Sequence, residues 1–200
     1  MKDLYLMRHG QTFFNQEGLV QGASDSPLTE LGQEQARQAG VYLKERGIRF
    51  GPLYSSTQER ACDTLELVSG RTDYTRLKGI KEWNFGIFEA QPERLQPKFR
   101  PGATSFEDLF VPYGGEGVDQ VGERVLVTLT EVMEQAGAEP VLAVSHGGAM
   151  WAFYLKIAAQ ALDPKVRFGN CAICYYHYEQ GYFKLAEVID PLTGDVYECE

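Results

Sequence analysis

Long apolar stretches and excess positive charge are both missing from this sequence, and each absence excludes a class of function. No apolar run approaches the ~20 residues that a membrane-spanning helix needs. Nineteen Lys and Arg residues stand against 28 Asp and Glu residues, so the formal net charge is −9. Nucleic acids and anionic membrane surfaces attract basic proteins, and we therefore expect neither as a partner.

The first residues also lack the basic and apolar pattern of a signal peptide. Lys2 and Asp3 lead directly into the apolar run that begins at Leu4. Together with the missing membrane span, this absence predicts a cytoplasmic protein.

Cysteine is scarce, and the chain contains only Cys62, Cys171, Cys174 and Cys199. The second and third of these have a Cys-x-x-Cys spacing, which can indicate metal or redox chemistry. No second pair and no suitably spaced histidine completes a zinc site, and residues 171–178 have the pattern of a buried strand. We therefore predict thiols that pack in the core and bind no metal.

The length and the hydrophobic pattern predict the fold class. Two hundred residues, 44% of them hydrophobic, fit one domain with a full core. Helical patterns alternate with short apolar runs, which predicts an α/β fold with a largely parallel sheet. We expect helices over about 29–46, 58–68, 118–135 and 149–162, and strands over 4–7, 52–56, 77–80, 141–144, 172–178 and 182–189. Residues 13–27 are expected to form a loop, and residues 91–113 are the least regular part of the chain.

The first apolar run ends in Arg8, His9 and Gly10. A strand of this kind delivers polar side chains to the carboxyl edge of an open α/β sheet, where such sheets bind ligands. An Arg beside a His suits a phosphoryl group, because a guanidinium binds phosphate oxygens while a neutral imidazole nitrogen attacks phosphorus. Gly10 lacks a Cβ and lets the backbone approach an anion. A capping Arg and a surface His fit the tripeptide equally well, so it decides nothing alone.

A second apolar run, 141–144, ends in Ser145, His146, Gly147 and Gly148. The chain has only three histidines, and two of them follow strand-like runs and precede a glycine. This repetition favours one site built from both strand ends over two unrelated surface histidines. The third histidine, His177, alternates with aromatic residues in a predicted hairpin, and we assign it to the surface of the sheet.

With both stretches in view, the sequence resembles the histidine phosphatase superfamily, also called the phosphoglycerate mutase-like family. The similarity covers most of the chain and follows one order of motifs: Leu6-Met7-Arg8-His9-Gly10-Gln11-Thr12 with Asn15, Gln21-Gly22, Asp25 to Gly32 with Gln35-Ala36, Ser55-Ser56, Arg60-Ala61 with Thr64, Glu82 to Gly86 with Phe88-Glu89, Gly114-Gly115-Glu116, and Ser145-His146-Gly147-Gly148. The resemblance implies a three-layer sandwich in which helices flank a mostly parallel central sheet. It also implies a single domain over residues 1–200, with 91–115 as a lid-like insertion.

The resemblance implies a reaction through a phosphohistidine. His9 would be the nucleophile, and its ordinary pKa near 6.5 leaves it neutral at cytoplasmic pH. Arg8, Arg60 and His146 would gather round the phosphoryl oxygens. A solvated Arg on the helix surface is the alternative for Arg60, but the order of two serines, Arg-Ala and Thr favours the site. We expect no metal and no cofactor, because the carboxylate clusters of magnesium-dependent phosphatases are missing.

Two glutamates compete for the role of the proton donor. Glu82, with Trp83 and Phe85 as apolar neighbours, is our candidate to protonate the leaving oxygen and then to help water attack the phosphohistidine. Glu89 lies on the same segment, and the family keeps a Glu there, usually before a Gly. Ala90 replaces that Gly here, and we assign Glu89 to structure.

The expected binding residues are less specific. Asn15, Gln21 and Gly22 match positions at which the family contacts phosphate, and Gly147 completes this phosphate- and substrate-binding set. Ordinary turn chemistry is the alternative, and it fits the neighbouring residues 25–27 better than it fits Asn15. In the lid-like insertion, Arg94, Lys98 and Arg100 either meet a second anionic group or are solvated, and the sequence leaves both readings open.

The predicted function is metal-independent hydrolysis of a small phosphorylated metabolite, and two alternatives remain. A cofactor-dependent phosphoglycerate mutase returns the phosphoryl group to another oxygen. Such mutases typically follow the acidic Glu with an Arg and are longer, whereas Trp83 stands there in this short chain. A non-catalytic module that binds a phospho-ligand is the other alternative, but no reactive residue is missing. The physiological substrate stays open, as does a homodimer.

Overall fold

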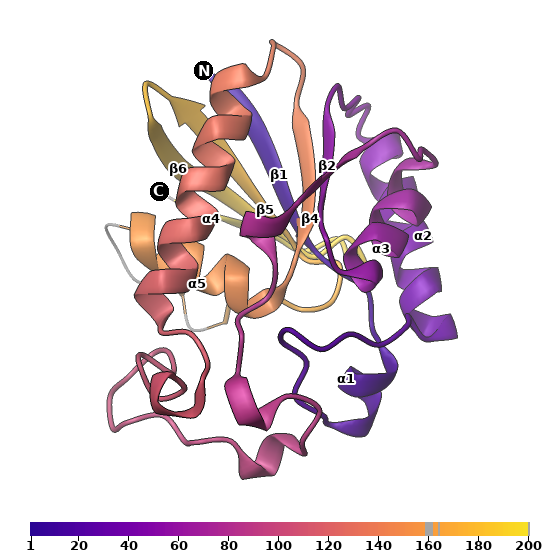
Figure 1. Ribbon diagram of the computed structural model, residues 1–200. Coiled ribbons are helices and arrows are strands. Elements are labelled where there is room, and N and C mark those ends of the chain that lie inside the picture. The colour runs from indigo at the N-terminus through magenta and orange to yellow at the C-terminus, as the bar shows by residue number, and fades with distance from the viewer. Residues whose placement is uncertain (159–161, 164, 200) are drawn as a thin grey trace.

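The computed structural model describes residues 1–158, 162–163 and 165–199 (Figure 1). Its middle layer is one seven-stranded sheet in the order β3-β2-β4-β1-β5-β6-β7. The strands are β1 (Lys2–Arg8), β2 (Leu53–Ser56), β3 (Thr75–Leu77), β4 (Val141–Ser145), β5 (Ile173–Glu179), β6 (Tyr182–Ile189) and β7 (Val196–Glu198).

The sheet combines a parallel half and an antiparallel half. β3, β2, β4 and β1 run parallel to one another, whereas β1-β5, β5-β6 and β6-β7 pair antiparallel. All five residues of β4 are buried, as expected for a central strand that is covered on both faces. The predicted α/β fold is confirmed, with a mixed sheet.

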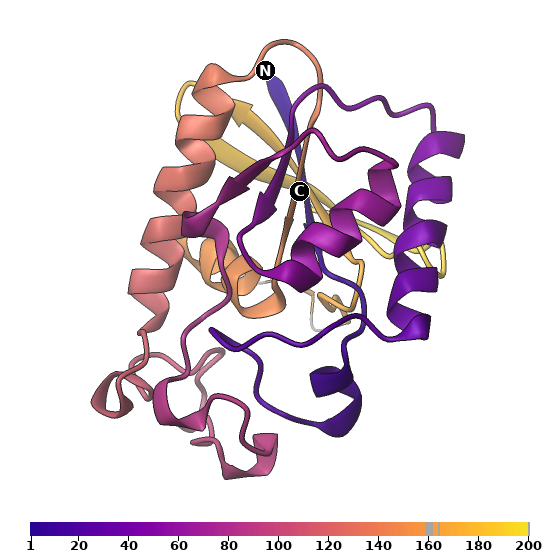
Figure 2. The same cartoon turned by 45° about the vertical axis from the view of Figure 1, so that its right-hand side comes forward.

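Helices cover both faces of this sheet and make two apolar cores. α2 (Glu30–Glu45) and α3 (Glu59–Ser69) pack on one face, and α4 (Val118–Gln135) and α5 (Gly147–Ile157) on the other (Figure 2). The central strand supplies both cores, because successive side chains point to opposite faces. Val141 and Ala143 join the α4-α5 core, whereas Leu142 and Val144 join the α2-α3 core.

Several predicted elements need correction. Residues 77–80 are not one strand: β3 ends at Leu77, and a 3₁₀ turn covers Lys78–Ile80. The expected loop 13–27 begins with a short helix, α1 (Phe13–Glu17), which Thr12 and Asn15 cap reciprocally. β7 at Val196–Glu198 was not predicted at all. Strands and helices this short carry too few residues for a periodic signal.

The last predicted helix, 149–162, begins earlier and ends sooner than expected. α5 covers Gly147–Ile157, and part of the predicted C-terminal end, 159–161, lies outside the described residues. Two consecutive glycines weaken the helical pattern at its start, because Gly is a poor helix former. The N–H groups of the second glycine and of Ala149 donate to a side chain from elsewhere in the chain, which is described with the site below.

The irregular segment 91–113 lies at the end of the sheet where β1 and β4 end (Figures 1 and 2). It contains the 3₁₀ turns Glu93–Leu95 and Val111–Tyr113. Phe106 and Phe110 pack against Trp83 and Phe85 with ring centroids 4.9–6.4 Å apart, which ties the segment to the α4-α5 core.

Cys62, Cys171 and Cys174 are buried, and Cys199 is half-buried. Their burial fits the prediction of core thiols, and burial raises the pKa of Cys171 to about 12. Among the described residues, no group of His, Cys, Asp and Glu is arranged to hold a metal ion. No helix in the described part of the chain combines the length and the apolar character that crossing a membrane requires.

The start of α2 packs against the backbone that follows His9. A Cβ on Gly32 would lie 1.9 Å from the carbonyl oxygen of Gln11. That oxygen also accepts the N–H of Thr29, the N-cap of α2, at 3.0 Å. No side chain fits between these two stretches of backbone.

We expect Gly32→Ala to lower the free energy of unfolding by roughly 1–3 kcal/mol, although Gly→Ala in an open helix normally stabilises a protein. The reason is the collision of the new methyl group with the Gln11 carbonyl. Gly137→Ala is the matched control, because a Cβ there meets nothing within 4 Å. Urea denaturation of both variants measures the difference, and equal stabilities would contradict this account of the packing.

Candidate active site

Two neighbouring parallel strands bring the two strand-end histidines together. β1 pairs with β4 in a register that places Arg8 opposite Ser145, so His9 and His146 follow side by side. Their ring centroids are 5.2 Å apart, and both side chains are buried. The backbone N–H of His9 donates to the Ser145 carbonyl at 3.1 Å and extends the pairing by one residue.

The contacts of His9 determine which ring nitrogen is free to react. Its Nδ1 lies 2.8 Å from the carbonyl oxygen of Gly10. A carbonyl only accepts hydrogen bonds, so Nδ1 carries the proton and Nε2 keeps its lone pair. The Nε of Arg60 donates toward that Nε2 at 3.3 Å.

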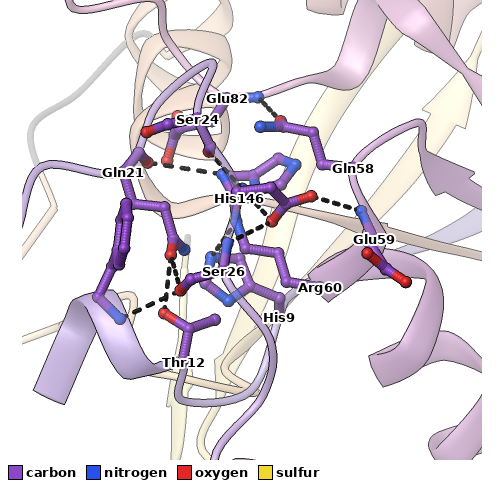
Figure 3. Close-up of polar contacts among 12 residues, drawn as sticks. His9, Thr12, Gln21, Ser24, Ser26, Gln58, Glu59, Arg60, Glu82 and His146 are labelled. Carbon is purple, nitrogen blue, oxygen red and sulfur yellow. Dashed lines mark hydrogen bonds and ion pairs between the residues drawn. The ribbon is translucent and has the colours of Figure 1, made fainter. Parts of the chain in front are cut away.

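Arg60 lies in the first turn of α3 and is completely buried (Figure 3). Its guanidinium donates to Asp25 Oδ1 at 2.7 Å and to backbone carbonyls of Ser24 at 3.0 Å and Gly22 at 3.2 Å. Burial lowers the pKa of this group, and Asp25 acts in the opposite direction. The result is a fixed cation beside the unprotonated Nε2 of His9.

Three other predicted site residues hold buried nitrogens that have no partner among the described residues. These atoms are Nε of Arg8, Nε2 of Gln21 and Nδ1 of His146. The rest of each side chain is anchored: Arg8 donates to the Phe168 carbonyl at 2.7 Å, and His146 Nε2 lies 2.7 Å from Ser56 Oγ. Buried donors normally find an acceptor, so an anion bound beside His9 would supply the missing hydrogen-bond acceptors for these nitrogens.

Both histidines are neutral in this environment. Burial, with the charges of Arg60 and Arg8, holds the pKa of His9 well below its ordinary 6.5. Burial, followed by Arg60 and His9, has the same effect on the pKa of His146. A neutral His9 is the form that can attack phosphorus.

Glu82 faces the N-terminus of α5. Its carboxylate accepts the N–H groups of Gly148 at 2.9 Å and Ala149 at 2.7 Å, and that of the adjacent Trp83 at 2.7 Å. A Cβ on Gly148 would lie 2.7 Å from this carboxylate, so the second glycine of the motif makes the approach possible. Glu82 and Arg8 both line an open pocket of about 550 Å³.

Two residues that the sequence reasoning missed hold the backbone of Glu82. Gln58 accepts its N–H at 2.8 Å and donates to the Gly22 carbonyl at 2.5 Å. Arg124 donates to its carbonyl at 2.9 Å and also binds the carboxylate of Glu116. The available signal for Arg124 was a cation between the core residues Val121 and Val125 of α4.

Glu89 binds the loop that Arg60 also contacts. Its carboxylate accepts the N–H groups of Gly22, Ala23 and Ser24 at 2.8–3.1 Å, and the Ser24 hydroxyl at 2.6 Å. It also accepts the N–H of Phe85 at 2.9 Å. All of these donors are structural, which fits the assignment of Glu89 to structure.

The predicted binding residues lie at different distances from the reaction. Gly22 is in the Arg60 loop, and Gly147 lies against Arg8, since a Cβ there would be 3.2 Å from its Nε. The Asn15 side chain caps α1 and lies 3.4 Å from Asn170. Asn170, which the sequence reasoning missed, also donates to the His9 carbonyl at 3.1 Å.

The three cations predicted in the lid-like insertion, Arg94, Lys98 and Arg100, do not line the pocket beside Glu82. Arg100 forms ion pairs with Glu107 and Asp108 at 2.7 Å each, within the same segment. Arg94 and Lys98 are exposed. Arg167 does line the pocket, together with Arg8; it follows the last predicted helix and was not singled out from the sequence.

A model of the histidine phosphatase superfamily (branch 1) matches residues 4–191. That range contains both strand ends, Arg60 and both glutamates. The chain belongs to the histidine phosphatase superfamily.

Relatives within this superfamily have names from two activities. The chain is 31% identical to "Probable phosphoglycerate mutase GpmB" of Salmonella paratyphi B, over 98% of this chain and 94% of the relative. A phosphoglycerate mutase structure from Bacillus anthracis matches with a TM-score of 0.78 and 27% identity, over 92% and 91% of the two chains. A phosphoserine phosphatase from Entamoeba histolytica in complex with 3-phosphoglyceric acid matches with a TM-score of 0.75 and 26% identity, over 94% and 96%. The expected family and fold are confirmed.

The neutral histidines of this superfamily member predict a loss of stability in mild acid. Below pH 6.5 the unfolded chain protonates both imidazoles, whereas the folded chain does not, so the unfolded state binds more protons. Stability should fall by up to about 1.4 kcal/mol per pH unit for each imidazole. Urea denaturation at several pH values should show a shallower fall in His9→Asn and a still shallower one when His146→Asn is added. Identical slopes in all three proteins would contradict the burial of two neutral imidazoles.

Proposed function

We propose that this protein hydrolyses phosphomonoesters of small metabolites through a phosphohistidine at His9, without a metal ion. The observation that carries the proposal is the pair of contacts at His9. Gly10 accepts the proton of Nδ1, and Arg60 lies 3.3 Å from Nε2, so the nucleophilic nitrogen is unprotonated and next to a cation. We also propose that residues 1–200 act as a single domain with 91–115 as its lid.

In the first step, Nε2 of His9 attacks phosphorus and the bond between phosphorus and the alcohol oxygen breaks. Arg8, Arg60 and His146 stabilise the charge that spreads over the phosphoryl oxygens. Gln21, Gly22 and Gly147 complete the phosphate pocket, and Asn15 holds its outer edge. The protonated carboxyl of Glu82 gives its proton to the departing oxygen, which leaves as an alcohol.

In the second step, water replaces the alcohol in the pocket beside Glu82. The Glu82 carboxylate now accepts a proton from this water, whose oxygen attacks the phosphohistidine. The bond between phosphorus and Nε2 breaks, and inorganic phosphate is released. His9 returns to its neutral form.

Hydrolysis is favoured over mutase activity by the residue that follows Glu82. The mutase pattern places an Arg there to contact substrate, whereas Trp83 is 2% exposed and donates its indole N–H to the Glu116 carbonyl at 2.6 Å. Trp83 therefore packs away from the pocket and offers no charge to a substrate carboxylate. The mutase names of several relatives make phosphoglycerate mutase the second candidate.

A panel of phosphomonoesters separates these candidates. A hydrolase releases phosphate from several of them, a mutase moves the phosphoryl group between oxygens of phosphoglycerate, and a binding module does neither. Release of phosphate with no transfer between the positions of phosphoglycerate is the result we expect.

His9→Ala should abolish phosphate release, because it removes the unprotonated nitrogen toward which Arg60 donates. Wild-type protein mixed with a radiolabelled substrate and quenched in acid should carry an acid-labile label, and the variant should carry none. A chelator should leave the wild-type rate unchanged. Circular dichroism checks that the variant is folded, and a label that persists in it would place the nucleophile elsewhere.

Glu82→Gln should lower the rate with an alkyl phosphate on the order of 10²–10⁴-fold. The loss in phosphohistidine formation with an activated aryl phosphate should be much smaller, since a nitrophenolate hardly needs a proton. Glu89→Gln is the matched control: it loosens the 22–24 loop and should affect both substrates alike. Pre-steady-state measurement of the phosphorylation step is required. A graded loss in Glu89→Gln and an equal loss in Glu82→Gln would reverse the two roles.

A further inference from the structure

The pocket beside Glu82 has two chemically different ends. At one end lie the groups assigned to the reaction: Arg8, Glu82 and the α5 N-terminus at Gly147 and Gly148. The remaining wall consists of Phe99, Thr104, Trp151, Val166, Arg167 and Phe168. Its volume of about 550 Å³ is within the range of small-molecule sites. The alcohol part of a phosphomonoester bound at His9 would face this wall.

The aromatic side chains of this wall are held in place by contacts on their outer sides. Trp151 donates its indole N–H to the Thr104 carbonyl at 2.9 Å, which leaves the indole with no donor to offer a ligand. Its ring meets that of Phe168 edge-on with centroids 5.7 Å apart. Phe99 packs edge-on against Phe106 at 4.6 Å. Three rings from three segments of the chain therefore line one side of the pocket.

This wall is fixed relative to the phosphate end. The carbonyl of Phe168 accepts the Arg8 guanidinium at 2.7 Å, while the Phe168 side chain lines the pocket. One residue thus orients a phosphate-binding cation and presents a ring to the alcohol. A group one short linker away from the phosphate would reach the rings.

Positive charge for a second anionic group is sparse along the same wall. Arg94, Lys98 and Arg100 do not line the pocket, and Arg100 already pairs with Glu107 and Asp108. Among the described residues, the cation in this wall is Arg167, and its side chain already donates to the Val166 carbonyl at 2.9 Å. Aromatic surface outweighs charge at this end.

We propose that the preferred substrates are phosphomonoesters whose alcohol carries an aromatic or similarly flat apolar group, which packs among Trp151, Phe168 and Phe99. The proposal rests on the proposed function, since the phosphate must be bound at His9. It narrows the substrate class from any small phosphorylated metabolite to those with a ring near the ester oxygen. Burial of a ring among other rings is favourable through both apolar area and edge-to-face contact.

A matched pair of substrates tests this preference. 3-Phenylpropyl phosphate and n-propyl phosphate release similar alkoxides, so they need the same acid catalysis and differ in the ring alone. We expect kcat/KM to be on the order of 10–100-fold higher for the phenyl compound. 3-Phosphoglycerate is the third substrate, and it tests for a second anionic group. A higher kcat/KM for 3-phosphoglycerate than for the phenyl compound would overturn the proposal.

Variants of the wall connect the preference to these residues. Trp151→Ala and Phe168→Ala should each lower the ratio of the two kcat/KM values several-fold. Phe99→Ala should lower this ratio as well. It is the wall variant least prone to misfolding, because the Phe99 side chain is 47% exposed and its loss should leave the fold intact. Tyr182→Ala, on a side chain that is 80% exposed in β6 and outside this pocket, is the control and should keep the wild-type ratio.

The outcomes separate the two proposals. Equal kcat/KM values for both compounds, with phosphate released from each, would overturn the aromatic preference and leave the hydrolase proposal standing. A preference that all three wall variants retain would likewise overturn the assignment to these rings. Absence of both phosphate release and phosphohistidine would overturn both proposals together.

Discussion

The buried guanidinium of Arg60 is the constraint on which the site depends. A cation removed from water needs acceptors on several sides, and Arg60 finds them in Asp25 and in the carbonyls of one loop. Glu89 binds the other set of backbone groups in that loop: its carboxylate accepts the N–H groups of residues 22–24. The peptide groups of the loop therefore lie between a buried cation and a carboxylate. Their carbonyl oxygens point toward Arg60 and their N–H groups toward Glu89, so each charge favours the peptide orientation that the other also binds. The loop is rigid because both ends of its peptides are used.

The same arrangement decides the chemistry available to the imidazoles. Burial makes protonation of His9 unfavourable, and the charges of Arg60 and Arg8 add to the effect. The positive charge that an anion requires is thus permanent, while the imidazole of His9 stays neutral. Glu82 is held in place by N–H groups in the first turn of α5, where a helix favours negative charge. The Glu82 carboxylate is thus bound by backbone N–H groups, and among the described residues it forms no ion pair with Arg8 or Arg60.

The sequence predicted the parts of the site that follow from strand ends. His9 and His146 could be placed together because parallel strands end at one edge of a sheet, and Arg60 because it opens the next helix. Gln58, Arg124 and Asn170 could not, because their role is to bind backbone groups that are distant in sequence, and an ordinary polar residue gives no sign of such a partner. The start of α5 was missed for a similar reason: the N–H groups of Gly148 and Ala149 are satisfied by Glu82, which lies 66 residues away from Gly148. The mixed sheet reflects a C-terminal hairpin that joins β1 from the other side.

The central place of β1 in the sheet also has a kinetic consequence. This strand forms from the first residues of the chain, yet its partners are β4 and β5, so Leu6 pairs with both Ala143 and Cys174. Contacts between such distant segments form late, because the loop between them must close first. During synthesis, β1, which His9 follows, lacks its partner strands until most of the chain has left the ribosome. His9 is therefore made early and acquires its electrostatic surroundings among the last events of folding.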